Sequence, residues 1–151
     1  MSIIPIEVAM QHVYADDADQ SQVQRKLDSA IATAEQFIGR KIYATNDERI
    51  EAKANAETEL DKIELFCRDV ENGVYKHSQR IADLKIQEAE NRMYELQMVM
   101  LGLVINPAIE IGILLILGDL YANRENTTEK TANELPMGAK HHLQPFRVMG
   151  I

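Results

Sequence analysis

The side chains best suited to binding a metal ion occur at two places in the sequence. One is the acidic run DDADQS at residues 16–21, whose carboxylates are oxygen ligands of the kind that calcium prefers. The run lacks the glycine and the distal glutamate of a calcium-binding loop, so helix capping and a solvated surface explain it better. The other place is the pair His141 and His142, but adjacent residues on a helix point about 100° apart and do not chelate one ion together. The sequence therefore predicts no metal site.

The only thiol in the chain is Cys67. It lies at an apolar position of a helical repeat with no histidine nearby in sequence, so we expect a buried apolar side chain and not a nucleophile. The chain has no glycine-rich phosphate loop, no HExxH and no GxSxG motif, and no pair of carboxylates stands out as an acid–base dyad. We therefore expect no enzymatic activity and no cofactor. The lone cysteine excludes an intramolecular disulfide, and the first residues lack the pattern of a signal peptide, which favours folding in the cytoplasm.

The acidic excess is distributed along the whole chain. The 151 residues carry a formal net charge of −8, and Asp plus Glu outnumber Lys plus Arg by 7 to 4 in residues 1–47, 12 to 8 in 48–104 and 5 to 4 in 105–151. Because nucleic-acid affinity depends largely on neutralising phosphates, a chain without a basic segment is a poor candidate for gripping DNA or RNA. The apolar fraction of 46% is that of an ordinary globular chain, and this length fits one domain.

Two helices are predicted in the N-terminal third. Residues 5–13 form a short apolar set at helical spacing, and residues 21–38 form a longer one. Asp19 or Ser21 would cap the second helix, and Gly39 stands where a helix C-terminus favours a left-handed residue.

A further helix is predicted to begin at Asn106, a strong N-cap residue, with Pro107 in its first position. It runs to about residue 123 and is apolar nearly all round, which indicates burial on all sides. A last helix opens at Pro136 and is closed by Pro145. No strand is predicted, so the sequence indicates an all-α fold.

The apolar run in residues 98–118 is long enough to cross a membrane and carries one charge, Glu110. Against a membrane span, Asn106 and Pro107 fall in its middle, and a central carboxylate costs about 2.5–3.5 kcal/mol on insertion. The flanks show no excess of Lys or Arg either. We expect two soluble helices that meet at Asn106, and no membrane contact.

Residues 48–104 contain two heptad stripes, which are typical of helices that pack on one another. The first stripe comprises Ala56, Leu60, Ile63, Cys67, Val70 and Val74, and the second comprises Ala82, Ile86, Ala89, Met93, Leu96, Met100 and Leu103. The break between them falls at residues 71–73, which predicts a hairpin of two antiparallel helices. Its second helix, residues 74–104, would be about 45 Å long if unbroken. A single long helix that dimerises is the alternative.

The two ends of the chain resemble the small head-tail connector proteins of tailed bacteriophages, also called adaptor or head-completion proteins. The resemblance covers residues 3–47 and 105–151: a helix that ends in a Gly-Arg turn, a buried helix that starts at a proline and ends in YxNRE, and a closing LPxG segment. The matching residues are Gly39, Arg40, Asn106, Pro107, Tyr121, Asn123, Arg124, Glu125, Leu135, Pro136, Gly138, Leu143, Pro145, Phe146 and Arg147.

The resemblance implies a single connector domain over residues 1–151, with residues 48–104 as an inserted helical hairpin that family members commonly lack. Such proteins form a ring beneath the portal at one capsid vertex, extend the DNA channel, and bind the next head-completion or tail protein. The portal is commonly dodecameric, and the ring is expected to match it. DNA would pass nearby without specific binding. The protein would be found in the virion neck and, during assembly, in the host cytoplasm.

Two other functions stay open at this point. One is a coiled-coil oligomerisation or regulatory protein unrelated to virions, in which residues 48–104 dimerise. The other is a small membrane-active phage protein. The connector is our leading hypothesis, since the heptad stripes lie between two halves of a recognisable domain.

Overall fold

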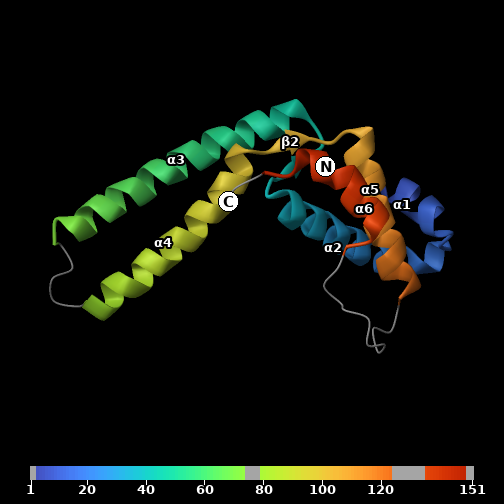
Figure 1. Cartoon of the computed structure of the whole chain (residues 1–151), viewed down its shortest axis with the longest axis horizontal. Helices are drawn as coiled ribbons and strands as arrows, with labels where there is room; N and C mark the ends of the chain where they lie inside the picture. The colour runs from blue at the N-terminus through green and yellow to red at the C-terminus, as the bar shows by residue number, and fades with distance from the viewer. Residues whose placement is uncertain (1–2, 74–78, 124–134, 149–151) are drawn as a thin grey trace.

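The computed structural model describes residues 3–73, 79–123 and 135–148. The expected all-α fold is confirmed, because helices account for most of these residues. The helices are α1 (Ile6–Val13), α2 (Gln20–Ile38), α3 (Asn46–Glu71), α4 (Gln79–Met100), α5 (Pro107–Ala122) and α6 (Met137–Leu143), with short 3₁₀ helices η1 (Asp17–Asp19) and η2 (Gln144–Phe146). They form an arch in which α1, α2, α5 and α6 make a compact core and α3 and α4 make an arm (Figure 1). We use "core" and "arm" for these two groups below.

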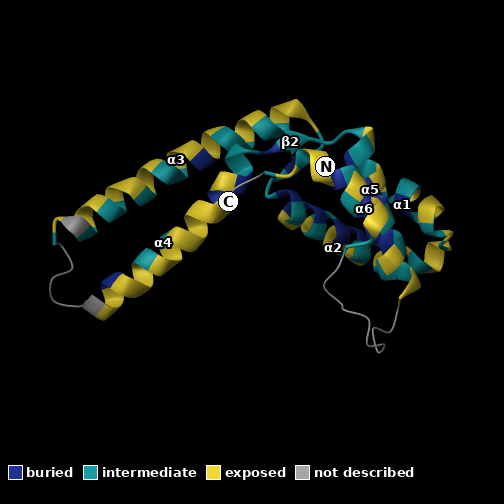
Figure 2. Ribbon diagram, viewed as in Figure 1, coloured by how far each residue is buried: buried dark blue, intermediate teal, exposed yellow. Residues whose placement is uncertain are grey.

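Helix α5 is the central helix of the core. It packs against α1, α2 and α6, and its buried residues are Ile109, Gly112, Ile113, Leu114, Ile116 and Leu117. Buried residues cover one broad side of the helix, but the predicted burial on all sides is wrong, because Ile111 is 45% exposed (Figure 2). On α2, Val23, Leu27 and Ile38 are fully buried against it.

Two of the predicted capping residues, Gly39 and Asn106, are confirmed. Gly39 adopts the left-handed conformation at the end of α2 (φ 68°), and its N–H donates to the carbonyl of Glu35 at 2.9 Å. The Asn106 side chain accepts hydrogen bonds from the first N–H groups of α5, at 3.0 Å each. The prediction that Asp19 or Ser21 caps α2 is wrong. The Asp19 side chain makes no capping hydrogen bond, and Ser21 lies inside the helix. The η1 turn leads into α2 instead, and Asp19 accepts a hydrogen bond from the hydroxyl of Tyr121 at 3.1 Å.

The prediction that the chain contains no strand is also wrong. Strands β1 (Ile42–Tyr43) and β2 (Leu103–Val104) pair in parallel, with Ile42 opposite Leu103. Parallel strands cannot be joined by a tight turn and need a crossover connection. The arm is that crossover, so both of its ends are fixed at one two-stranded junction with the core.

In the arm, α3 and α4 lie side by side and run antiparallel (Figure 1). Helix α3 ends at Glu71 and Gly73 has a φ of 77°, which confirms the predicted break. Ala56 on α3 and Ala82 on α4 are each only 3% exposed, as the heptad stripes predict.

The prediction for the second arm helix is wrong about where the helix ends and about the burial of Met93. Helix α4 ends at Met100, and Leu103, expected in the stripe, belongs to β2. Met93 is 46% exposed although the stripe points it toward α3, and nothing in the structure explains this. Val74 lies outside the described residues.

Candidate functional site at the junction of arm and core

The first and last motif segments meet at the end of α2. The N–H of Val148 donates to the carbonyl of Ile38 at 2.9 Å. The guanidinium of Arg147 lies over the ring of Phe37, 5.3 Å from its centroid, at a distance where cation and ring attract. The left-handed turn at Gly39 and the C-terminal segment are therefore one structural unit.

The LPxG segment covers α5. Leu143 is fully buried, and a Cβ added at Gly112 would lie 2.8 Å from its Cγ atom, so the glycine allows the two helices to come close. Gly138 plays the same part beside Leu115, at 3.2 Å. The other members of the segment lie at its edges: Leu135 and Phe146 pack half-buried against the core, Pro136 precedes α6, and Pro145 is exposed in η2.

The YxNRE segment ends α5 at the surface. Tyr121 bonds to Asp19, and the ammonium of Lys26 donates to the carbonyl of Leu120 while lying 5.9 Å from the centroid of the Tyr121 ring. Asn123 donates to Asp119 at 3.0 Å across one turn. Arg124 and Glu125 lie outside the described residues. The described motif residues thus build and close the core, and none of them lines the two clefts found among the described residues.

Arg40 points instead to the junction with the arm. Its Nη1 atom donates to the carbonyl of Leu101 at 3.3 Å, while its Nε atom is buried without a hydrogen-bond partner among the described residues. Next to it, the N–H of Lys41 donates to the carbonyl of Met98 at 2.9 Å, and the carbonyl of Lys41 accepts from Leu103 at 3.0 Å. The Arg40 side chain and the Lys41 backbone therefore hold the end of α4 and the start of β2.

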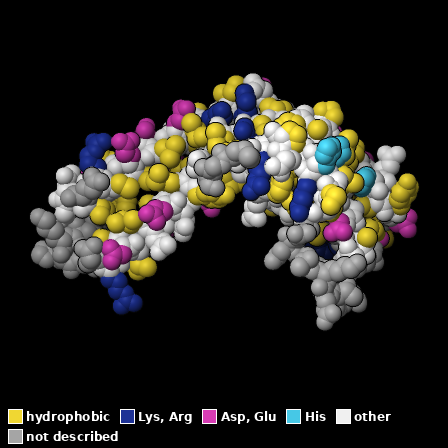
Figure 3. All heavy atoms as spheres, in the orientation of Figure 1, with side chains coloured by type: hydrophobic (Ala, Val, Ile, Leu, Met, Phe, Trp, Pro, Cys, Tyr) yellow, Lys and Arg dark blue, Asp and Glu magenta, His cyan; other side chains and the backbone are white. Residues whose placement is uncertain are grey.

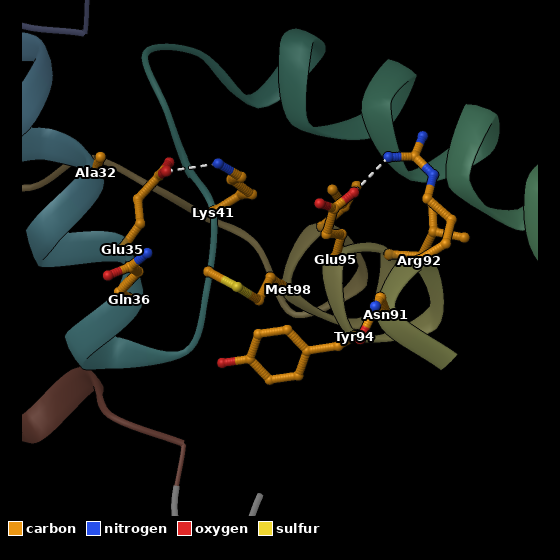
Figure 4. Close-up of a pocket in the computed structure, with 11 residues that line it drawn as sticks. Ala32, Glu35, Gln36, Lys41, Asn91, Arg92, Tyr94, Glu95 and Met98 are labelled. Carbon is orange, nitrogen blue, oxygen red and sulfur yellow. Dashed lines mark hydrogen bonds and ion pairs between the residues drawn. The ribbon is translucent and has the colours of Figure 1, made fainter. Parts of the chain in front are cut away.

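A cleft of about 630 Å³ lies at this junction, between α2 and α4. Figure 4 shows Glu35 and Lys41 on its core side. Glu35 is 7% exposed, and it accepts bonds from the ammonium of Lys41 at 2.6 Å and from the N–H of Ile42 at 3.0 Å. A buried carboxylate needs such partners, so this network fixes β1 to α2.

The opposite wall comes from α4. Arg92 bonds to Glu59 of α3 and to Glu95, both at 2.6 Å, and these bonds raise the pKa of Arg92 above its usual value. Tyr94 and Met98 extend toward α2 (Figure 4). The charged groups drawn in the cleft are paired, Glu35 with Lys41 and Arg92 with Glu95, and these ion pairs fix the shape of the cleft (Figure 4).

Tyr43 lies on β1, next to Ile42, whose N–H bonds to Glu35. Its pKa is raised by burial and, to a smaller extent, by the nearby charge of Glu35. A Cβ on Gly102 would come within 2.5 Å of the Tyr43 ring, so the two strands approach closely where core and arm join.

Several of these junction residues belong to no motif, and sequence reasoning missed them. Glu35 lies between the buried apolar residues Ala34 and Ile38 of α2. A carboxylate at such a position only weakly indicates that the side chain is buried with a partner. Lys41 and Met98 are 57 residues apart in the chain and no local pattern links them. Cys67, expected to be buried, is half-buried within the arm.

Within residues 3–73, 79–123 and 135–148, no three His, Cys, Asp or Glu side chains are grouped so that they could hold a metal ion. No described helix has the length and apolarity needed to span a bilayer. His141 and His142 contact each other edge to face, with ring centroids 5.9 Å apart.

The chain matches no known family profile, no curated protein and no solved structure. Its resemblance to phage connectors consequently depends on the motif residues themselves and on how they are arranged.

Proposed function

We propose that this protein is a head-tail connector of a tailed bacteriophage, which forms a ring under the portal, joins head to tail and extends the DNA channel. One observation carries the proposal. Motif segments that lie far apart in the sequence, at Gly39 and Arg147, are in contact in a single small helical core. A set of matching residues that also forms one structural unit is harder to obtain by chance than isolated matches.

The shape of the molecule supports a ring. A cyclic assembly needs two different surfaces on each subunit that fit one another. The arch has a hollow side between arm and core and a convex side opposite (Figure 3). Its net charge of −8 also suits a channel, because an acidic lining would not retain the DNA that passes.

Tyr14 is the residue we assign to contact with the portal or with the next neck protein. Its side chain is 94% exposed and its backbone is left-handed, with a φ of 52°, which costs a bulky residue energy in the free protein. Exposed aromatic side chains are frequent anchors in protein interfaces. Met137, 86% exposed at the start of α6, is a second such side chain.

The arm is proposed to add contacts to a neighbouring subunit or to the portal. To test this, residues 46–100 are replaced by a flexible linker of about a dozen residues, the length that a parallel strand crossover needs. The core should remain helical by circular dichroism while assembly with the portal is impaired. An unfolded product would show that arm and core are one folding unit.

A coiled-coil regulatory protein is the alternative, and burial in the arm argues against its simplest form. Ala56, Ala82 and Leu96 of the heptad stripes are buried within one chain, where α3 and α4 pack as an antiparallel hairpin, so these three positions are not exposed for a long dimerising helix. Light scattering separates the two functions. A stable dimer at every concentration, with no larger ring on addition of portal, contradicts the connector.

A further inference from the structure

The walls of the cleft between α2 and α4 diverge with distance from the β1/β2 junction (Figure 1). Three residues on the side of α4 that lines this cleft, spaced by three and four, show the change in burial. Met98 is 7% exposed, Tyr94 one turn earlier is 48% exposed, and Asn91 is exposed. Burial therefore decreases steadily away from the junction, as in a wedge.

Among the residues that the structure describes, the hydrogen bonds between arm and core lie at the narrow end of the wedge. The N–H of Lys41 donates to the carbonyl of Met98 at 2.9 Å, and Arg40 donates to the carbonyl of Leu101 at 3.3 Å. No hydrogen bond or ion pair joins a described residue of α2 to one of α4. An attachment confined to one end allows the rest of the arm to rotate about that end.

The ion pairs of the cleft each lie within one wall. Glu35 is paired with Lys41 on the core side, and Arg92 is paired with Glu59 and Glu95 on the arm side. Bringing the two walls together would therefore break none of these pairs.

The side chains that would meet on closure are small or uncharged. Helix α2 contributes Ala32 and Gln36, which are exposed, and α4 contributes Tyr94 and Asn91 (Figure 4). Closure would remove the half-exposed ring of Tyr94 from water, which is favourable. The amides of Gln36 and Asn91 can each donate and accept a hydrogen bond on contact.

Both connections between core and arm contain a glycine before a strand. Gly39, with a φ of 68°, precedes β1, and Gly102 directly precedes β2. Hinge motions are absorbed by a few residues at the ends of elements, and these residues are often small. The two glycines therefore stand where a hinge would need them.

We propose that the arm pivots about the β1/β2 junction and closes the cleft, so that Tyr94 packs on Ala32. The open and closed states differ in the angle between arm and core. In the proposed ring, this angle decides which surfaces a copy offers to its neighbours. Closure takes place within one chain, so the inference does not depend on the connector function.

Disulfide trapping in the full-length protein tests the closure. Cys67→Ser removes the native thiol, and Ala32→Cys and Asn91→Cys place one thiol on each wall, both at exposed positions. A disulfide needs Cα atoms within about 7 Å of each other, so an intramolecular disulfide under mild oxidation shows that the walls meet. We expect this product, and little of it when Glu90→Cys replaces Asn91→Cys, because position 90 points about 100° away on α4.

A change at Tyr94 gives a second readout. Tyr94→Ser should slow disulfide formation between positions 32 and 91 by roughly three- to tenfold, because closure no longer buries about half of an aromatic side chain. Met93→Ser is the matched control, since Met93 is 46% exposed but does not line the cleft, and it should leave the rate unchanged. Circular dichroism checks that both chains fold.

The outcomes separate this inference from the proposed function. A folded protein that forms no disulfide between positions 32 and 91, or equal rates for the two serine variants, overturns the closure. A cleft that stays open and becomes protected only when portal is added is a docking site for a partner, which also overturns it. Closure in a protein that never binds a portal supports the inference and contradicts the connector, whereas portal binding without closure leaves the connector standing.

Discussion

The packing of Leu143 over Gly112 provides a quantitative test of the core. Leu143→Ala removes a fully buried side chain and should lower the free energy of unfolding by about 2–5 kcal/mol. Gly112→Ala has two opposing effects. Alanine stabilises a helix interior by about 1 kcal/mol relative to glycine, while the new Cβ, 2.8 Å from Cγ and 2.9 Å from Cδ2 of Leu143, costs about 1–3 kcal/mol through overpacking.

The free energy of unfolding of the double variant should be higher than the sum of the two single effects predicts. In Gly112→Ala/Leu143→Ala the clashing atoms are gone, so the alanine at 112 should stabilise the protein by about 1 kcal/mol. The coupling free energy is then about 1–3 kcal/mol, measured by urea unfolding followed by circular dichroism.

A matched control comes from the same helix. Among the described residues, a Cβ on Gly118 would meet His12 alone, at 3.6 Å from Nε2 and 4.0 Å from Cδ2. Gly118→Ala should therefore stabilise the protein by about 1 kcal/mol, whether position 143 is Leu or Ala. If the effects of the 112 and 143 changes add to within about 0.5 kcal/mol, then α6 does not dock on α5 as described.

Four other changes test the junction, the caps and the exposed contact. Gly102→Ala forces the Tyr43 ring away and should lower the free energy of unfolding by about 1–3 kcal/mol in urea; unchanged stability would contradict the close approach. Burial raises the pKa of Tyr43 above 10.0 in the folded protein, so above about pH 10 the tyrosine ionises first in the unfolded chain. The free energy of unfolding should therefore be unaffected by ionisation of Tyr43 below about pH 10 and should fall at higher pH. Tyr43→Phe should make this fall smaller in thermal melts at alkaline pH. Asn106→Ala should cost about 1 kcal/mol and Asn106→Asp much less, since aspartate still caps. Tyr14→Asn should leave stability unchanged or raise it by up to about 1 kcal/mol, yet weaken binding to the portal in a pull-down assay; equal binding would remove Tyr14 from the interface.

The features that the sequence predicts correctly are those set by neighbouring residues. Gly39 ends α2 because a left-handed residue costs glycine little, and Asn106 starts α5 because its side chain bonds to N–H groups two and three residues ahead. The heptad stripes are also local, and Ala56 and Ala82 are buried as expected.

The features that escaped prediction depend on residues far apart in the chain. Strand β1 pairs with β2 across 61 residues, from Ile42 to Leu103, and each strand is too short to leave an alternating pattern. The cleft between α2 and α4 likewise exists only because Lys41 is held by the base of α4. At Asp19, a long-range bond to Tyr121 replaces the local cap that its residue type favours.

Negative-stain microscopy of the purified protein, alone and mixed with the portal protein encoded in the same genome, tests the connector proposal most directly. A connector should appear as an added ring on one face of the portal, with the same rotational symmetry as the portal. A folded protein that leaves the portal particles unchanged at saturating concentration would contradict the proposal.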